Sequence, residues 1–145
     1  MAGRPTKKGK AGKSRPSGPA RCAVLWGLDS SGERGAAVRG VLKEMGVLAR
    51  TATYERLGDP AGALADEPGL RRSPVPYRGP APEGEFVLLC NLSPDDVDRF
   101  LALSRERGCS VDAKAMLTRT NRTWPLVRLV AEVQAEHRAM AGADE

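Results

Sequence analysis

Two strand-like segments, each followed by a segment with helical periodicity, constrain the fold of this chain most strongly. Ala23–Leu28 is nearly all apolar, as a strand covered on both faces is, and Glu85–Leu92 is the clearest strand of the sequence. Apolar residues recur at helical spacing over Glu33–Met45, and Gly46 is typical of a helix end. Val47–Tyr54 is rich in β-branched residues and is predicted as the next strand.

The second half of the chain has the same order of elements. Ser93 followed by Pro94 and two aspartates predicts a helix start, because the serine caps the helix and the acids face its positive end. Val111–Leu117 alternates in polarity as a strand does, and a last helix is predicted from about residue 124 to residue 140. The two halves align if the span from Leu28 to Gly46 contains a two-residue insertion relative to the span from Leu92 to Gly108, which indicates an internal repeat.

Two strand–helix–strand units and a terminal helix predict an α/β (α+β) fold: a ferredoxin-like βαββαβ two-layer sandwich with an added C-terminal helix. A small flavodoxin-like parallel sheet is the alternative. Residues 21–142 are expected to form a single domain, in which the Pro- and Gly-rich stretch 55–84 is an irregular connector. Residues 1–20 have almost no apolar side chains to bury and are predicted to be a disordered basic tail.

The positive charge is concentrated in that tail. Seven of the 23 basic residues precede the first acid, Asp29, so the rest of the chain has 16 basic and 18 acidic residues. A basic arm favours nucleic acid or another polyanion. A terminus that only aids solubility explains the same composition.

Cysteine and histidine usage points to the cytoplasm and away from metals. The chain has three cysteines without a C-x-x-C pair and a single histidine, His137. This set fits a reducing compartment, and we expect no metal site and no cofactor. Cys22–Leu28 is too short for a secretory signal, and no run approaches the roughly 20 apolar residues of a membrane helix. We therefore expect a cytoplasmic protein that does not associate with membranes.

The richest segment chemically runs from Lys114 to Arg128, with four basic residues and no acid. It leads from a strand end to a helix start, where free backbone N–H groups and the helix dipole favour a phosphate or carboxylate. The candidate anion site comprises Lys114, Thr118, Thr120, Asn121, Arg122 and Trp124. Alternatively, the threonines and Asn121 shape the turn and cap the helix, while the arginines are solvated.

Glu136 and His137 on the last helix are further candidates. His137 is a general base or ligand in a functional interpretation, or a partly buried packing residue, since it follows Val133 by one helical turn. We predict no catalytic residue, because Cys90 and Cys109 are typical of inert core thiols.

Three motifs of the second half, F-V-L-L-C-N-L-S-P-D-D-V-D-R-F-L, K-A-M-L-T-R-T-N-R-T-W and A-E-V-Q-A-E-H, resemble a bacterial family known as domain of unknown function 3783. The resemblance is strongest over residues 86–140. The family pattern K-A-x-L-T-x-T-N-x-x-W, followed by a helix ending in E-H, falls on Lys114, Leu117, Thr118, Thr120, Asn121, Trp124, Glu136 and His137. Arg119 and Pro125 depart from the pattern, so the turn is expected to differ there. The resemblance implies a bacterial domain, but it does not indicate an activity, a substrate or a cofactor.

Three functions follow as hypotheses. The first is an uncharacterised cytoplasmic, non-enzymatic module that binds a small anionic ligand or a protein partner; pairing of sheet edges would make it a homodimer. The second is a nucleic-acid-associated protein that makes nonspecific contacts through residues 1–21. The third, an enzyme using Lys114, Asn121 or His137, has the least support, since no nucleophile motif or metal set accompanies them.

Overall fold

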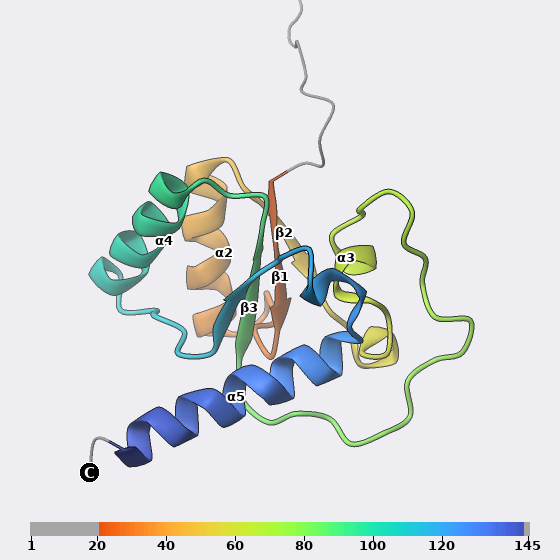
Figure 1. The fold of residues 1–145 in the computed structure, drawn as a ribbon. Coiled ribbons are helices and arrows are strands. Elements are labelled where there is room, and N and C mark those ends of the chain that lie inside the picture. The colour runs from red at the N-terminus through yellow and green to blue at the C-terminus, as the bar shows by residue number, and fades with distance from the viewer. Residues whose placement is uncertain (1–20, 144–145) are drawn as a thin grey trace, which may run out of the picture.

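The computed structural model describes residues 21–143, so the predicted tail of residues 1–20 lies outside the described residues. Four strands form one sheet in the order β2-β1-β3-β4 (Figure 1). Their bounds are Cys22–Trp26 for β1, Leu48–Thr51 for β2, Phe86–Cys90 for β3 and Lys114–Met116 for β4. The helices are α2 (Glu33–Met45), α3 (Ala61–Leu64), α4 (Pro94–Glu106) and α5 (Leu126–Ala143), with short 3-10 turns η1 (Tyr54–Arg56) and η2 (Asn121–Thr123).

The strand order corrects the predicted ferredoxin-like topology. β1 is parallel to β2, β3 is parallel to β4, and the central β1–β3 pair is antiparallel. The two parallel strands of each unit are therefore direct neighbours, whereas a ferredoxin-like fold splits them with another strand. The long connector after β2 replaces the β2–β3 hairpin that a ferredoxin-like sheet requires. The mixed sheet also excludes the all-parallel alternative.

The central strand pair relates the two halves by an approximate two-fold axis. In the register of β1 and β3, Val24 lies opposite Leu88. Leu28 and Leu92 are aligned in the repeat, and Val24 and Leu88 lie the same number of residues before them. Val24 and Leu88 are therefore equivalent positions of the two halves and also face each other in the sheet. The internal repeat seen in the sequence thus corresponds to two βαβ units that meet back to back along β1 and β3.

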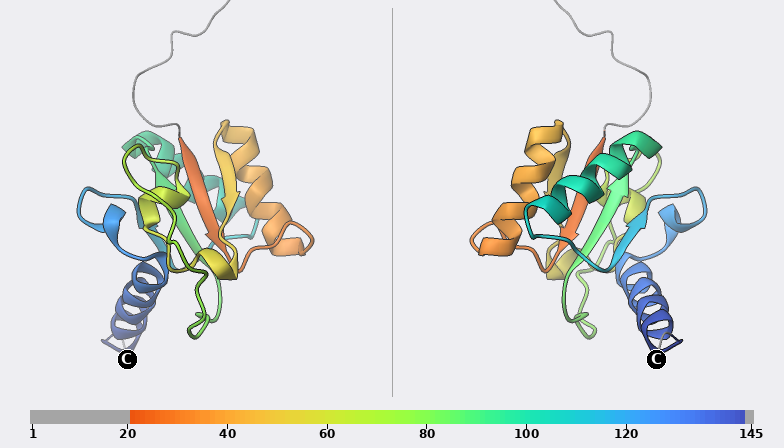
Figure 2. Two further views of the ribbon diagram at one scale, coloured as in Figure 1. Left: turned by 90° about the vertical axis from the view of Figure 1, so that its right-hand side faces the viewer. Right: turned by 90° about the vertical axis from the view of Figure 1, so that its left-hand side faces the viewer.

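Apolar residues cover both faces of the sheet, which gives three layers instead of the predicted two (Figure 2). One cluster lies between the sheet and α2 and α4, and includes Leu25, Val38, Leu42, Leu89 and Phe100. The other lies beneath the connector and α5, and includes Val24, Leu57, Leu88, Leu126 and Val130. All five residues of β3 are buried, as expected for a strand covered on both faces. The two-layer expectation was wrong because the connector and α5 pack on the second face.

The helix boundaries follow from local capping. Ser93 Oγ accepts a hydrogen bond from the Asp96 amide at 3.1 Å, and the Ser93 amide donates to the Asp96 carboxylate at 3.3 Å, so α4 begins with a capping box as predicted. Arg21 donates to the same carboxylate at 2.9 Å, and this bond, with that of the Ser93 amide, lowers the pKa of Asp96. Gly46 ends α2 in the left-handed conformation, with φ of 74°. Among residues 21–143, no helix has both the length and the apolar character needed to cross a bilayer.

Two glycines of α2 are expected to respond oppositely to alanine. A Cβ atom at Gly35 would lie 1.9 Å from the carbonyl oxygen of Asp29, whereas a Cβ at Gly40 would have no neighbour within 4 Å. Gly35→Ala should lower the free energy of unfolding by about 1–3 kcal/mol, because the loop before α2 must move. Gly40→Ala should raise it by about 0.5–1 kcal/mol through helix propensity alone. Urea denaturation of both variants checks this, and equal effects would contradict the close packing of α2 on residue 29.

Candidate functional site

The turn after β4 is built by Thr118 and Asn121. The Thr118 amide donates to Asn121 Oδ1 at 2.8 Å, and the Asn121 amide donates to Thr118 Oγ1 at 3.1 Å. Asn121 Nδ2 donates to the carbonyl oxygen of Met116 at 3.0 Å, and the residue is 8% exposed. These reciprocal bonds hold the T-x-T-N sequence in the tight turn that contains η2.

Three of the four cationic side chains of the same segment also have partners within the chain, and the fourth, Arg119, is exposed. Arg122 Nε donates to Glu67 Oε1 at 2.8 Å, and Lys114 Nζ donates to the carbonyl oxygen of Val111. The Arg128 guanidinium lies over the Trp124 ring, 4.2 Å from its centroid. Thr120 is exposed at the surface.

The first amides of α5 are occupied as well. The Leu126 amide donates to the Asp59 carbonyl and the Val127 amide to the Leu57 carbonyl, each at 2.9 Å. In return the Ala61 amide donates to the Trp124 carbonyl at 2.8 Å. The segment 114–128 therefore joins β4, the connector and α5, and its proposed donors to an anion serve this junction. Its role in anion binding remains a prediction.

The importance of the turn to folding is open to a direct test. Asn121→Ala removes two side-chain hydrogen bonds from a buried position, and we expect a loss of about 1–3 kcal/mol in the free energy of unfolding. Thr120→Ala is the matched control, because Thr120 is exposed and makes no side-chain capping bond; its effect should stay within about 0.5 kcal/mol. Equal stability of the two variants in urea would show that Asn121 does not hold the turn.

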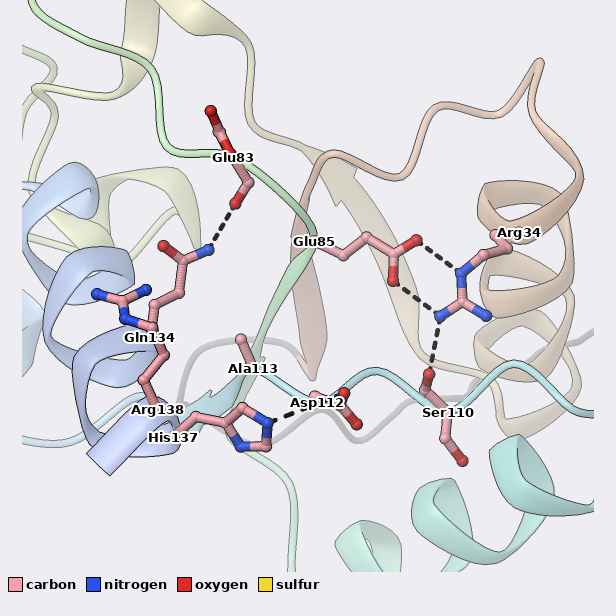
Figure 3. A pocket seen from close by; sticks show the side chains of 9 residues that line it. All are labelled: Arg34, Glu83, Glu85, Ser110, Asp112, Ala113, Gln134, His137 and Arg138. Carbon is pink, nitrogen blue, oxygen red and sulfur yellow. Dashed lines mark hydrogen bonds and ion pairs between the residues drawn. The ribbon is translucent and has the colours of Figure 1, made fainter. Parts of the chain in front are cut away.

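A pocket of about 280 Å³ lies where β3 and β4 begin, against α5 (Figure 3). Its lining residues are Arg34, Glu83, Glu85, Ser110, Asp112, Ala113, Gln134, His137 and Arg138. His137 is thus the one candidate site residue from the sequence that lines this pocket. Glu136 is exposed on α5 and does not line it, and the anion-site candidates of residues 114–124 lie elsewhere.

One wall of the pocket is held by a bidentate ion pair. Arg34 Nε and Nη2 donate to the two carboxylate oxygens of Glu85 at 2.6 and 2.8 Å, and Nη2 also donates to the Ser110 carbonyl at 2.8 Å. These bonds join α2 to the start of β3 and to the loop before β4 (Figure 3). The charge of Arg34 is therefore neutralised by Glu85.

The opposite wall comes from α5. Gln134 Nε2 donates to the Glu83 carbonyl at 2.7 Å, which holds the end of the connector against the helix. His137 Nε2 lies 3.9 Å from Asp112 Oδ2, and the His137 side chain is 53% exposed. His137 is therefore not the partly buried packing residue that its place on the apolar stripe favoured. Among residues 21–143, the Arg138 side chain has no hydrogen-bond or ion-pair partner.

Sequence reasoning missed Arg34, Glu85 and Ser110. They come from three separate elements, and only the antiparallel pairing of β1 and β3 brings the start of α2 close to the start of β3. Within the described range 21–143, no group of three His, Cys, Asp or Glu side chains converges to hold a metal ion.

A comparison with protein families found a match for the second half of the chain. Residues 85–140 match the model of a family described as a domain of unknown function (DUF3783), which confirms the resemblance inferred from the motifs of this segment. The matched segment holds β3, α4, β4, the Thr118–Asn121 turn and most of α5. No curated protein and no solved structure gave a match.

Proposed function

We propose that this chain is a non-enzymatic binding module and that the pocket between α5 and the starts of β3 and β4 holds a small, carboxylate-bearing ligand. The observation that carries this proposal is the position of Arg138. Arg138 lines the concave surface, and its side chain has no protein partner among residues 21–143. A guanidinium with free donors binds a carboxylate in a fork geometry.

The other charges of the pocket narrow the class of ligand. The Arg34–Glu85 pair is neutral overall, which leaves the carboxylates of Glu83 and Asp112, the guanidinium of Arg138 and the imidazole of His137. A ligand with both a carboxylate and a hydrogen-bond donor satisfies these four groups better than a simple anion does. The volume, about 280 Å³, lies at the small end of ligand pockets, so the chemistry favours a compact amphoteric molecule of amino-acid size.

The pocket is tested by NMR titration with sodium acetate and glycine, using sodium chloride at equal ionic strength as the reference. We expect saturable amide shifts at Ser110, Asp112 and Gln134, with glycine binding more tightly than acetate. Arg138→Ala should weaken binding by roughly 10-fold or more, because a charge-assisted hydrogen bond is lost. Arg128→Ala is the matched control, since Arg128 is on the same helix and stacks on Trp124 away from the pocket. Shifts no larger than those with chloride, or equal effects of the two variants, would refute the proposal.

A second candidate function is nucleic-acid association, and the observation that favours it is the concentration of seven basic residues before Asp29. Duplex DNA and RNA are titrated with the full chain and with a chain starting at Arg21. We expect the full chain to bind with an affinity that falls by roughly 10³-fold or more between about 50 and 200 mM salt. We expect the shortened chain not to bind. Equal binding by both chains would show that the residues before Arg21 do not provide the affinity for nucleic acid.

A further inference from the structure

Two cysteines face each other across the central strand pair. Cys22 of β1 is the direct register partner of Cys90 of β3. Directly paired residues in an antiparallel ladder have Cα atoms about 4.5–5.5 Å apart, which lies within the range of about 4.4–6.8 Å that a disulfide spans. Both thiols are free, and both belong to the apolar cluster on the α5 side of the sheet. The separation of their Cα atoms is therefore compatible with a disulfide.

An arginine lies on the same face beside these thiols. Arg50 of β2 pairs in register with Val24, two residues from Cys22, so its side chain shares that face. Arg50 Nη2 donates to Asp66 Oδ2 at 3.0 Å, while Arg50 Nε is buried without a hydrogen-bond partner in the described part of the chain. A buried donor of a charged group is costly unless an acceptor or a negative charge lies near it. A Cys22 thiolate would provide that charge.

The two thiols differ in acidity. The Cys90 thiol donates to the Leu88 carbonyl at 3.6 Å and is also a polar neighbour of Cys22. Its contact with Cys22, together with the Arg50 guanidinium, lowers the pKa of the Cys22 thiol. The same contact and burial raise the pKa of Cys90, which keeps its proton. This asymmetry is that of an attacking thiolate beside a resolving thiol.

We propose that Cys22 and Cys90 form a redox-active dithiol that a peroxide converts to a disulfide, with Cys22 as the attacking thiolate and Cys90 as the resolving thiol. Cys22 attacks one peroxide oxygen, an S–O bond forms, the O–O bond breaks, and the leaving hydroxide takes a proton to become water. The Cys90 sulfur then attacks the Cys22 sulfenic acid, the S–S bond forms, and the S–O oxygen leaves as a second water with the Cys90 proton. Overall, two thiols lose two electrons and hydrogen peroxide gains them.

The position of the pair fits a small oxidant. Cys22 is 1% exposed, and the neighbouring Arg50–Asp66 ion pair lies at the surface, with 74% of the Asp66 side chain exposed. We expect peroxide to reach Cys22 when this surface ion pair opens.

Cys109 is an internal control. It is equally buried, at 2% exposed, but lies in the apolar cluster on the opposite side of the sheet. The full chain is treated with hydrogen peroxide, and its thiols are mapped by mass spectrometry after alkylation. We expect a Cys22–Cys90 disulfide, seen as the loss of two hydrogens, while Cys109 stays reduced. Oxidation of all three cysteines at one rate, or a Cys22–Cys90 pair that stays reduced while Cys109 reacts, would overturn the proposal. This measurement needs no variant.

Variants test the roles assigned to each group. Arg50→Gln should slow disulfide formation by roughly 10-fold, because loss of the guanidinium charge raises the pKa of the Cys22 thiol and lowers its thiolate fraction. Lys43→Gln, which removes an exposed cation from α2, should leave the rate unchanged. In Cys90→Ser, a sulfenic acid at Cys22 should accumulate and react with dimedone. A Cys90→Ser protein that folds, by circular dichroism, and gives no dimedone adduct would contradict the role of Cys22 as the attacking group.

Discussion

The antiparallel pairing of β1 with β3 is the contact on which the rest of the structure depends. It joins two βαβ units around an approximate two-fold axis at Val24 and Leu88, and it determines which residues of the two units meet. At one end of the pair, Trp26 opposes Phe86, and Arg34 just beyond reaches Glu85 beside the pocket. At the other end, Cys22 opposes Cys90. A shift of one residue in this register would turn each strand's side chains to the opposite face and separate both groups.

The second constraint is the cover of the sheet face that α2 and α4 leave open. A strand pair as apolar as β1 and β3 requires burial on both faces, and the long connector supplies it together with α5. Asp59 is central to this layer: it is 2% exposed, its carboxylate accepts from Arg56 Nε and the Ser73 amide at 2.8 Å, and its carbonyl accepts from the first amide of α5. The connector is thus an ordered structural layer, and its irregular backbone is stabilised by specific acceptors.

The elements determined by local chemistry could be predicted from the sequence, whereas those determined by pairing could not. The predicted bounds of α2 agree with the structure, and α4 begins at its predicted cap, because Gly46 and Ser93 act within one turn of each helix. The strand order was wrong because neither alternation nor apolar runs state which strands become neighbours. The partners of the 114–128 segment were equally hidden: Glu67 is 55 residues from Arg122 in sequence, and only the fold brings them together. The position of His137 on the last helix was predicted, but its exposure was not. Its place on the apolar stripe did not show that α5 extends past the edge of the sheet.

The pocket and the dithiol lie at opposite ends of the same strand, and this separates their chemistry. β3 has five residues, and at about 3.3 Å per residue its ends are roughly 13 Å apart. A disulfide at Cys90 therefore cannot touch a ligand held beside Glu85. The proposed ligand pocket and the proposed redox-active pair of Cys22 and Cys90 would thus be two separable properties of one sheet.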